Sequence, residues 1–110
     1  MDNITFADFQ NMDIRVAEIK AAEEIEGADK LYKLTVSLGE EERQLVAGIK
    51  PYYPIDQLVG KKVLILANLE PRTIRGVESR GMVLCAHNED RTQLTCTTVE
   101  RDIAPGSKVS

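Results

Sequence analysis

Alternation of apolar and polar residues runs through much of the chain and predicts short strands. The clearest case is KLYKLTVSL (30–38), where Tyr32, Leu34, Val36 and Leu38 share one face. A second alternation starts at Ile14 and changes phase after Val16, which a β-bulge or a sharp bend allows. Further apolar runs predict the remaining strands: RQLVAGI (43–49), KVLILAN (62–68), GMVLCAH (81–87) and QLTCTTV (93–99).

Helical spacing occurs at the N-terminus, where Phe6, Phe9 and Met12 recur every three residues. Thr5, followed three residues later by Asp8, matches a capping pattern. We therefore expect one short helical segment within residues 1–12. Residues 13–110 then hold five or six short strands and no helix long enough for a βαβ unit. A small closed all-β barrel with a C-terminal edge is the economical fold, forming a single domain over 1–110.

Composition narrows the class of protein without identifying a function. The hydrophobic (43%) and charged (29%) shares are those of an ordinary globular domain. No stretch approaches the roughly 20 apolar residues of a membrane helix, and the acidic N-terminus lacks the pattern of a secretion signal. We expect a cytoplasmic protein with no membrane partner. Cys85 and Cys96 are expected to be free thiols, and with His87 as the single histidine the chain lacks the ligands for a zinc site.

No motif indicates catalysis. The chain has no Walker-type phosphate loop and no GxSxG, and neither cysteine is accompanied in sequence by a plausible base. The acidic residues gather in turns and near the N-terminus, where a solvated surface explains them. We therefore expect a non-catalytic protein without a cofactor.

The net charge of -4 conceals a reversal of sign along the chain. Residues 1–29 contain eight acidic and two basic side chains, whereas residues 61–80 contain five basic and two acidic ones. Local potential, rather than total charge, attracts a polyanion. The basic segment is therefore where a binding function is expected.

The segment EPRTIRGVESRGM (70–82) combines cationic and hydrogen-bonding side chains with glycine. Its three arginines are Arg72, Arg75 and Arg80. Arginine binds phosphate through its fork geometry and stacks on bases. Ser79 adds a hydroxyl, and the nearby Asn68 adds an amide. The set suits single-stranded or loop RNA, although on these residues alone a solvated turn explains it equally well.

Three further side chains leave alternatives open. Lys30 begins the clearest strand, a position where most lysines simply face solvent. Tyr52 and Tyr53 lie between two prolines and suit either base stacking or packing against the barrel, and we favour packing.

Five motifs in a fixed order resemble the EMAP II-type tRNA-binding domain. They are DIRVAEI (13–19), ADKLYKLTV (28–36), LVAGI through LVGKKV (45–63), ANLEPRTIRGVESRGM (67–82) and PGSKV (105–109). The resemblance covers essentially the whole chain and implies an OB-fold, a five-stranded barrel with a short N-terminal helix and a small C-terminal extension. Members occur as freestanding structure-specific tRNA-binding proteins, as C-terminal parts of methionyl-tRNA synthetases, and as separate β-subunit-like chains.

The resemblance implies tRNA binding without chemistry, in support of an aminoacyl-tRNA synthetase, with methionyl-tRNA synthetase as the first candidate. The positions that match the tRNA-facing residues of the family are Lys30, Asn68, Arg72, Arg75, Ser79 and Met82. Arg80 is added from its charge alone, because the family often has lysine or glutamine there. Met82 would otherwise be assigned to the core.

Freestanding members of this family are commonly homodimers, and we expect the same here. The predicted contacts are Phe6 and Phe9 of the helix and the C-terminal edge after Val99. The alternative is that the helix plugs one end of the barrel. Two other functions also remain open: a peptide-binding chaperone of the secretion-chaperone type on the same barrel, and a structural subunit that docks on a synthetase.

Overall fold

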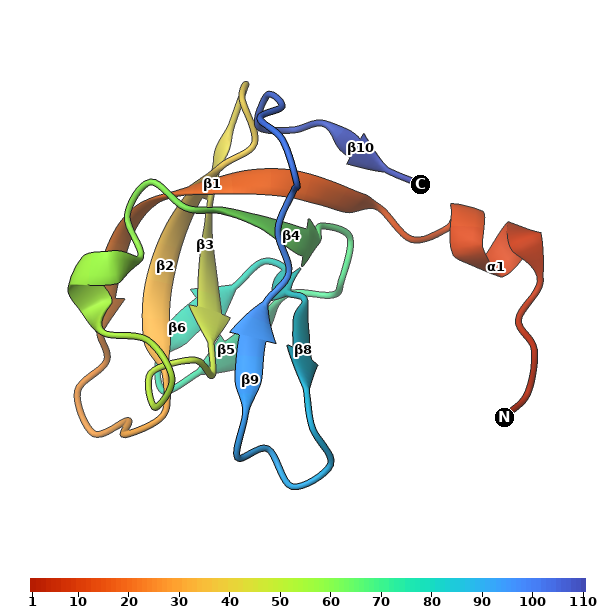
Figure 1. Cartoon of the computed structure of the whole chain (residues 1–110). Helices are drawn as coiled ribbons and strands as arrows, with labels where there is room; N and C mark the ends of the chain where they lie inside the picture. The colour runs from red at the N-terminus through yellow and green to blue at the C-terminus, as the bar shows by residue number, and fades with distance from the viewer.

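The computed structural model describes all 110 residues and consists mostly of strands (Figure 1). Its helical elements are the α-helix α1 (Phe6–Gln10) and the 3-10 turn η1 (Ile55–Gln57). The strands of the main sheet are β1 (Ile14–Glu24), β2 (Tyr32–Ser37), β3 (Glu42–Ala47), β4 (Lys62–Leu66), β7 (Met82–Val83) and β10 (Lys108–Val109). The remaining strands are β5 (Arg72–Ile74), β6 (Val77–Ser79), β8 (Cys85–His87) and β9 (Leu94–Cys96). The all-β, OB-like fold expected from the sequence is confirmed.

The main sheet is antiparallel, runs in the order β3-β2-β1-β4-β7, and curves into a nearly closed barrel. β1 is long enough to serve both halves, since residues 14–18 pair with β4 and residues 18–24 pair with β2. The register against β2 shifts between Ile19 and Ala21. The pairing with β4 is regular from Ile14 to Glu18, so no bulge lies at the change of phase after Val16, where one was expected.

The change of phase after Val16 has a different cause, because Val16 and Ala17 are both buried. Ala17 belongs to the barrel core. Val16 is covered by the C-terminal segment: its N–H donates to the Ser107 carbonyl at 2.9 Å, and the Gly106 N–H donates to its carbonyl at 2.7 Å. The C-terminal edge thus closes over the outside of β1, and β10 pairs with the start of the same strand.

The alternation over residues 30–38 places its apolar side chains on one face of a strand, as predicted, and that face lies in the core. Tyr32, Leu34, Val36 and Leu38 are all buried and belong to one hydrophobic cluster inside the barrel. Complete burial of a side chain of this size contributes about 1.5–3 kcal/mol. The strand pattern is therefore enforced by burial on one face.

The helix α1 begins as predicted but does not plug the barrel. The Asp8 N–H donates to the Thr5 hydroxyl at 3.1 Å, which caps the helix. Figure 1 shows α1 standing apart from the strands, and none of its residues is buried. Phe6 is 71% exposed. None of the helices has the length and hydrophobicity that a membrane crossing requires.

Replacement of Gly106 by alanine tests the C-terminal closure. Gly106 has φ +89°, and an added Cβ would lie 2.2 Å from the Leu38 carbonyl oxygen. Gly60 has a similar φ of +95° but open space around it. We expect Gly60→Ala to lower the free energy of unfolding by about 1 kcal/mol, from backbone strain alone. Gly106→Ala should lose roughly 3 kcal/mol or more, because the clash adds to the strain.

Urea unfolding of both variants provides the measurement. If Gly106→Ala is no less stable than Gly60→Ala, the C-terminal segment does not pack on β1 and Leu38 as described.

Candidate nucleic-acid interface

The segment with the predicted arginines forms a β-hairpin outside the main sheet. β5 and β6 pair from Arg72 with Ser79 to Ile74 with Val77, which leaves Arg75 and Gly76 as a two-residue turn. Both turn residues have positive φ, +53° and +78°, as a type I′ turn requires. Asparagine, aspartate or glycine is the usual residue at the position of Arg75, since other side chains are strained there by about 1–2 kcal/mol. The hairpin presents its guanidinium at the tip in spite of this cost.

Hydrogen bonds to β3 fix the base of this hairpin. The Ser79 hydroxyl accepts from the Val46 N–H at 2.9 Å and donates to the Gly81 carbonyl at 3.1 Å. The Gln44 side-chain amide donates to the Glu78 carbonyl at 2.9 Å, and the Arg80 N–H donates to the Gln44 carbonyl at 2.9 Å. These bonds join the end of the hairpin to the barrel edge.

A small apolar cluster holds the tip of the hairpin against the turn before β2. Ile25, Ala28 and Val46 are buried there, and Ile74 and Val77 of the hairpin pack against them. The packing brings Lys30 and Arg75, far apart in sequence, to the edges of one hollow. The Arg75 guanidinium lies close to Gly27, at 4.0 Å from where a Cβ would stand. Lys30 and Arg75 therefore border one hollow, where the two cations outnumber a single acid, Asp29.

Arg72 and Met82 border a second hollow at the base of the hairpin, together with Ser79 and the acidic Glu70. Met82 is 43% exposed, so it lies on the surface, as the resemblance implied. Arg80 is not part of this arrangement. It lies close enough to Glu41 for its charge to lower the pKa of that carboxyl, although Arg43, which is hydrogen-bonded to Glu41, has the larger effect. Arg80 thus faces the β2–β3 connection.

Two predicted site residues have side chains that are engaged within the protein. Ser79 is 5% exposed and both roles of its hydroxyl are used. Asn68 is exposed, but its amide accepts from the Asp13 N–H at 2.9 Å and donates to the Asn11 carbonyl at 2.6 Å. In this structure Ser79 positions the hairpin and Asn68 ties the helix exit to β4, while direct RNA contact by either residue stays a prediction.

The predicted cations differ from the other basic side chains in their partners. Lys30, Arg72, Arg75 and Arg80 are exposed and belong to no ion pair. Seven of the other ten basic residues are ion-paired: Arg15, Lys20, Lys33, Arg43, Lys50, Lys62 and Lys108. Unpaired guanidinium and ammonium groups remain available for phosphate oxygens.

The sequence interpretation missed Arg91, which lies in the turn between β8 and β9 and is also unpaired. Its φ is +58°, and Arg75 and Arg91 are the two non-glycine residues of the chain with positive φ. The signal available in the sequence was the turn NEDR (88–91), which carries a single cation after two acids. The distribution of charge along the chain does not reveal Arg91, because the neighbouring Glu89 and Asp90 cancel its charge.

Both tyrosines make contacts within the protein through their hydroxyls, which agrees with the packing role favoured from the sequence. The Tyr53 ring packs against the core, and its hydroxyl accepts from the Cys96 N–H at 3.0 Å. The Tyr52 hydroxyl donates to the Arg91 carbonyl at 2.6 Å. Tyr52 therefore helps to hold the β8–β9 turn in place.

The two free cysteines lie directly opposite each other on β8 and β9. A hydrogen bond with the Cys85 thiol lowers the pKa of Cys96 to about 7, with help from the Tyr53 hydroxyl and the charge of Lys61. The same contact, together with partial burial, raises the pKa of Cys85. Of the two thiols, Cys96 is therefore the one that ionises first.

Comparisons with known proteins cover the whole chain. A family model described as a putative tRNA binding domain matches residues 14–108. Methionine–tRNA ligase of Caldanaerobacter subterraneus is 50% identical over 110 residues, which are 100% of this chain and 17% of that protein. The chain spans about a sixth of the length of the curated relatives it matches.

Two solved structures share the barrel. The MetRS related protein from Pyrococcus horikoshii is 35% identical, with a TM-score of 0.94 and complete coverage of both chains. The CsaA chaperone protein from Picrophilus torridus is 32% identical, with a TM-score of 0.87, and covers 98% of this chain and 100% of its own.

The thiol pair generates a prediction on reactivity and pH. A pKa of about 7 makes Cys96 about half ionised near neutral pH, whereas an ordinary cysteine ionises near pH 8.5. We expect iodoacetamide to alkylate Cys96 faster than Cys85 at pH 7, with a rate that rises through a midpoint near 7. Peptide mass spectrometry across a pH series measures both rates.

Cys85→Ala provides the matched variant, because it removes the hydrogen-bond donor that lowers the Cys96 pKa and puts no other donor in its place. Its Cys96 midpoint should move upward. Equal rates for the two thiols in the wild type would contradict the assignment.

Proposed function

The chain belongs to the putative tRNA binding domain family, and from this premise we propose that it binds tRNA without catalysing a reaction. The resemblance seen in the five sequence motifs is thereby confirmed. The observation that carries the proposal is the set of unpaired cations on the β5–β6 hairpin and the turn before β2. Lys30, Arg72 and Arg75 border the two hollows and are free of ion pairs, whereas seven of the ten basic residues outside the predicted set are paired.

The proposed mechanism divides the work between contact and positioning. Lys30, Arg75 and Arg72 bind backbone phosphates from the rims of the two hollows. Met82 offers an apolar surface to a ribose or base. Ser79 holds the hairpin at the angle that brings these groups together.

The acidic remainder of the molecule supports selection by shape. The chain has a net charge of -4, so a polyanion is attracted to the cationic surface and repelled elsewhere. An RNA whose folded backbone presents several phosphates within this small area satisfies both conditions. An extended strand that lies across the acidic surface does not.

A homodimer is part of the proposal, because an exposed apolar hollow lies between α1 and β10. Its residues are Phe6, Phe9, Gln10, Met12, Lys108, Val109 and Ser110. A second copy of the chain would cover these side chains and link two cationic surfaces, which raises the effective affinity if one tRNA spans both. At the C-terminal edge this hollow is lined by residues of β10 and Ser110 and does not include Val99. Val99 is half-buried, and its part in a dimer contact stays a prediction.

We further propose that the chain supports an aminoacyl-tRNA synthetase in the cytoplasm, with methionyl-tRNA synthetase as the first candidate. Support comes from the relatives named methionine–tRNA ligase, in which the matching region is a small part of the protein. The second candidate function is peptide binding by a chaperone. The similarity to a CsaA chaperone protein favours it.

Charge reversal on the hairpin tests tRNA binding. Arg72→Glu/Arg75→Glu should abolish tight binding of intact tRNA, because two phosphate contacts become repulsive. The plot of log K against log salt has a negative slope, and its magnitude should decrease by about 1.4 to 1.8. Fluorescence anisotropy over a salt series measures both quantities, with an unstructured RNA of equal length as competitor.

Lys61→Glu/Arg101→Glu is the matched control. These two cations are also unpaired and exposed, and the double variant changes the net charge by the same amount. If the control loses as much affinity, total charge decides binding and the proposed surface is wrong. If the wild type ignores tRNA but binds an unfolded peptide, the chaperone function replaces the proposal.

Arg75→Asn separates stability from binding at a single position. Asparagine suits the positive φ of this turn, so the free energy of unfolding should rise by as much as about 1 kcal/mol. Loss of the guanidinium should weaken tRNA binding by about tenfold. Urea unfolding and anisotropy give the two values, and a variant that is less stable or binds equally well would contradict the assigned role.

A further inference from the structure

The β8–β9 hairpin carries a second arginine in a strained turn. Arg91 has φ +58°, in the left-handed region that most side chains avoid. Arg75, the other residue of this kind, lies in the proposed tRNA surface. Backbone strain that persists in a turn where asparagine or glycine would relieve it points to a role for the side chain.

The turn around Arg91 is held rigidly, yet its acids do not neutralise the guanidinium. The Asp90 carboxylate accepts from the Thr92 hydroxyl at 2.8 Å and from the Thr92 N–H at 3.2 Å. The Asn88 amide donates to the Thr92 hydroxyl at 2.8 Å, and the Tyr52 hydroxyl donates to the Arg91 carbonyl at 2.6 Å. Arg91 forms no ion pair. The backbone at Arg91 is therefore held in place, and its guanidinium is free to bind an anion.

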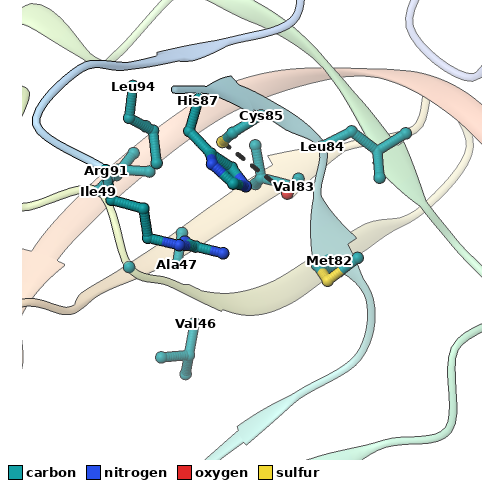
Figure 2. Close-up of a pocket in the computed structure, with 11 residues that line it drawn as sticks. Val46, Ala47, Ile49, Met82, Val83, Leu84, Cys85, His87, Arg91 and Leu94 are labelled. Carbon is teal, nitrogen blue, oxygen red and sulfur yellow. Dashed lines mark hydrogen bonds between the residues drawn. The ribbon is translucent and has the colours of Figure 1, made fainter. Parts of the chain in front are cut away.

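Arg91 and His87 border a hollow of about 330 Å³ between the end of β3 and the β7–β8 segment. Apolar side chains supply most of its lining, among them Ile49, Leu94 and Met82. Figure 2 shows the Arg91 side chain extended across this space and the His87 ring directed toward it. No carboxylate lines the hollow. The site therefore combines an apolar floor with a cationic rim.

This hollow is continuous with the proposed tRNA surface. Met82 and Val46 line it and also line the neighbouring hollow that contains Arg72 and Ser79. An RNA bound by Arg72 and Met82 thus has the Arg91 hollow as the next surface along its path. The two hollows together extend the proposed RNA-binding surface from the β5–β6 hairpin to the β8–β9 hairpin.

We propose that this hollow takes one unstacked nucleotide of the bound RNA, an inference that rests on the proposed tRNA binding. The base lies against Ile49, Leu94 and Met82, and the Arg91 guanidinium binds the adjacent phosphate. The volume is at the lower end of the range for small-ligand sites, about 300–1,000 Å³, which suits a single nucleotide. The cationic rim without acids complements a phosphate, whereas an apolar peptide would leave Arg91 without a partner.

The Nδ1 atom of His87 lies 2.8 Å from the Asn88 carbonyl, so this nitrogen is the donor. In the neutral ring the other nitrogen, Nε2, is then a hydrogen-bond acceptor. His87 therefore adds a polar group to the rim that can accept from the exocyclic amine of a base.

Methyl NMR of the protein with labelled isoleucine, leucine and methionine tests the proposal, with intact tRNA as the probe. Ring currents from a bound base should shift the methyl signals of Ile49, Leu94 and Met82. Ile103, which is 48% exposed in the C-terminal segment, is the control methyl and should not move. An apolar peptide is titrated in a second arm.

Arg91→Asn removes the guanidinium and suits the positive φ, so it keeps the turn folded. We expect tRNA affinity to fall by about tenfold, the salt slope to fall by about 0.7 to 0.9, and the shifts at Ile49 and Leu94 to disappear. Arg101→Asn, at an exposed unpaired arginine outside the hollow, should bind as the wild type does.

Two results overturn the nucleotide site while the tRNA function stands. In the first, the wild type binds tRNA, but the Ile49 and Leu94 signals do not move. In the second, Arg91→Asn binds tRNA as tightly as the wild type. If the wild type binds no tRNA, the proposed function is wrong and the nucleotide site is wrong with it. If only the peptide shifts these methyls, the hollow is a peptide site.

Discussion

The closure of the barrel between β3 and residues 78–81 is the constraint on which the rest of the site depends. No strand ladder joins these segments; side chains and isolated backbone bonds do, through Ser79, Gln44 and Arg80. The approach is close, since a Cβ on Gly81 would lie 3.0 Å from both a Leu45 methyl carbon and the Leu66 carbonyl oxygen. A glycine at this crossing lets β6 pass over the barrel edge, and the direction of the whole β5–β6 hairpin follows from that crossing.

A hairpin fixed in this way brings distant parts of the sequence to one surface. Its apolar side packs on the turn before β2, which places Arg75 beside Lys30. Its base places Arg72 beside Met82. Because the frame is rigid, the arginine side chains need not be ordered by contacts among themselves, and they remain free of ion pairs. Ser79 thus fixes the position of other groups through its hydrogen bonds to Val46 and Gly81.

The barrel strands were predictable because burial enforces alternation, as in β2, and the helix start was predictable because Thr5 caps locally. The segment GMVLCAH shows the limit of that reasoning. It was predicted as one strand, yet the structure divides it at Leu84 into β7, which pairs with β4, and β8, which pairs with β9. An apolar run specifies burial but not a change of partner. The strained turn at Arg91 was equally invisible, because φ at a non-glycine residue is set by the hairpin register rather than by the residue.

The fold alone does not decide between RNA and peptide, since a MetRS related protein and a CsaA chaperone protein share the barrel. The energetics of individual residues are more informative. Two arginines sit in backbone conformations that cost about 1–2 kcal/mol each, and an asparagine at either position would remove most of that strain. Binding of an apolar peptide gains nothing from a free guanidinium, so a peptide-binding function would give no reason for arginine at these strained positions. A polyanion gains a phosphate contact at each tip, which offsets the strain. The positions of the strain therefore argue that this barrel binds RNA.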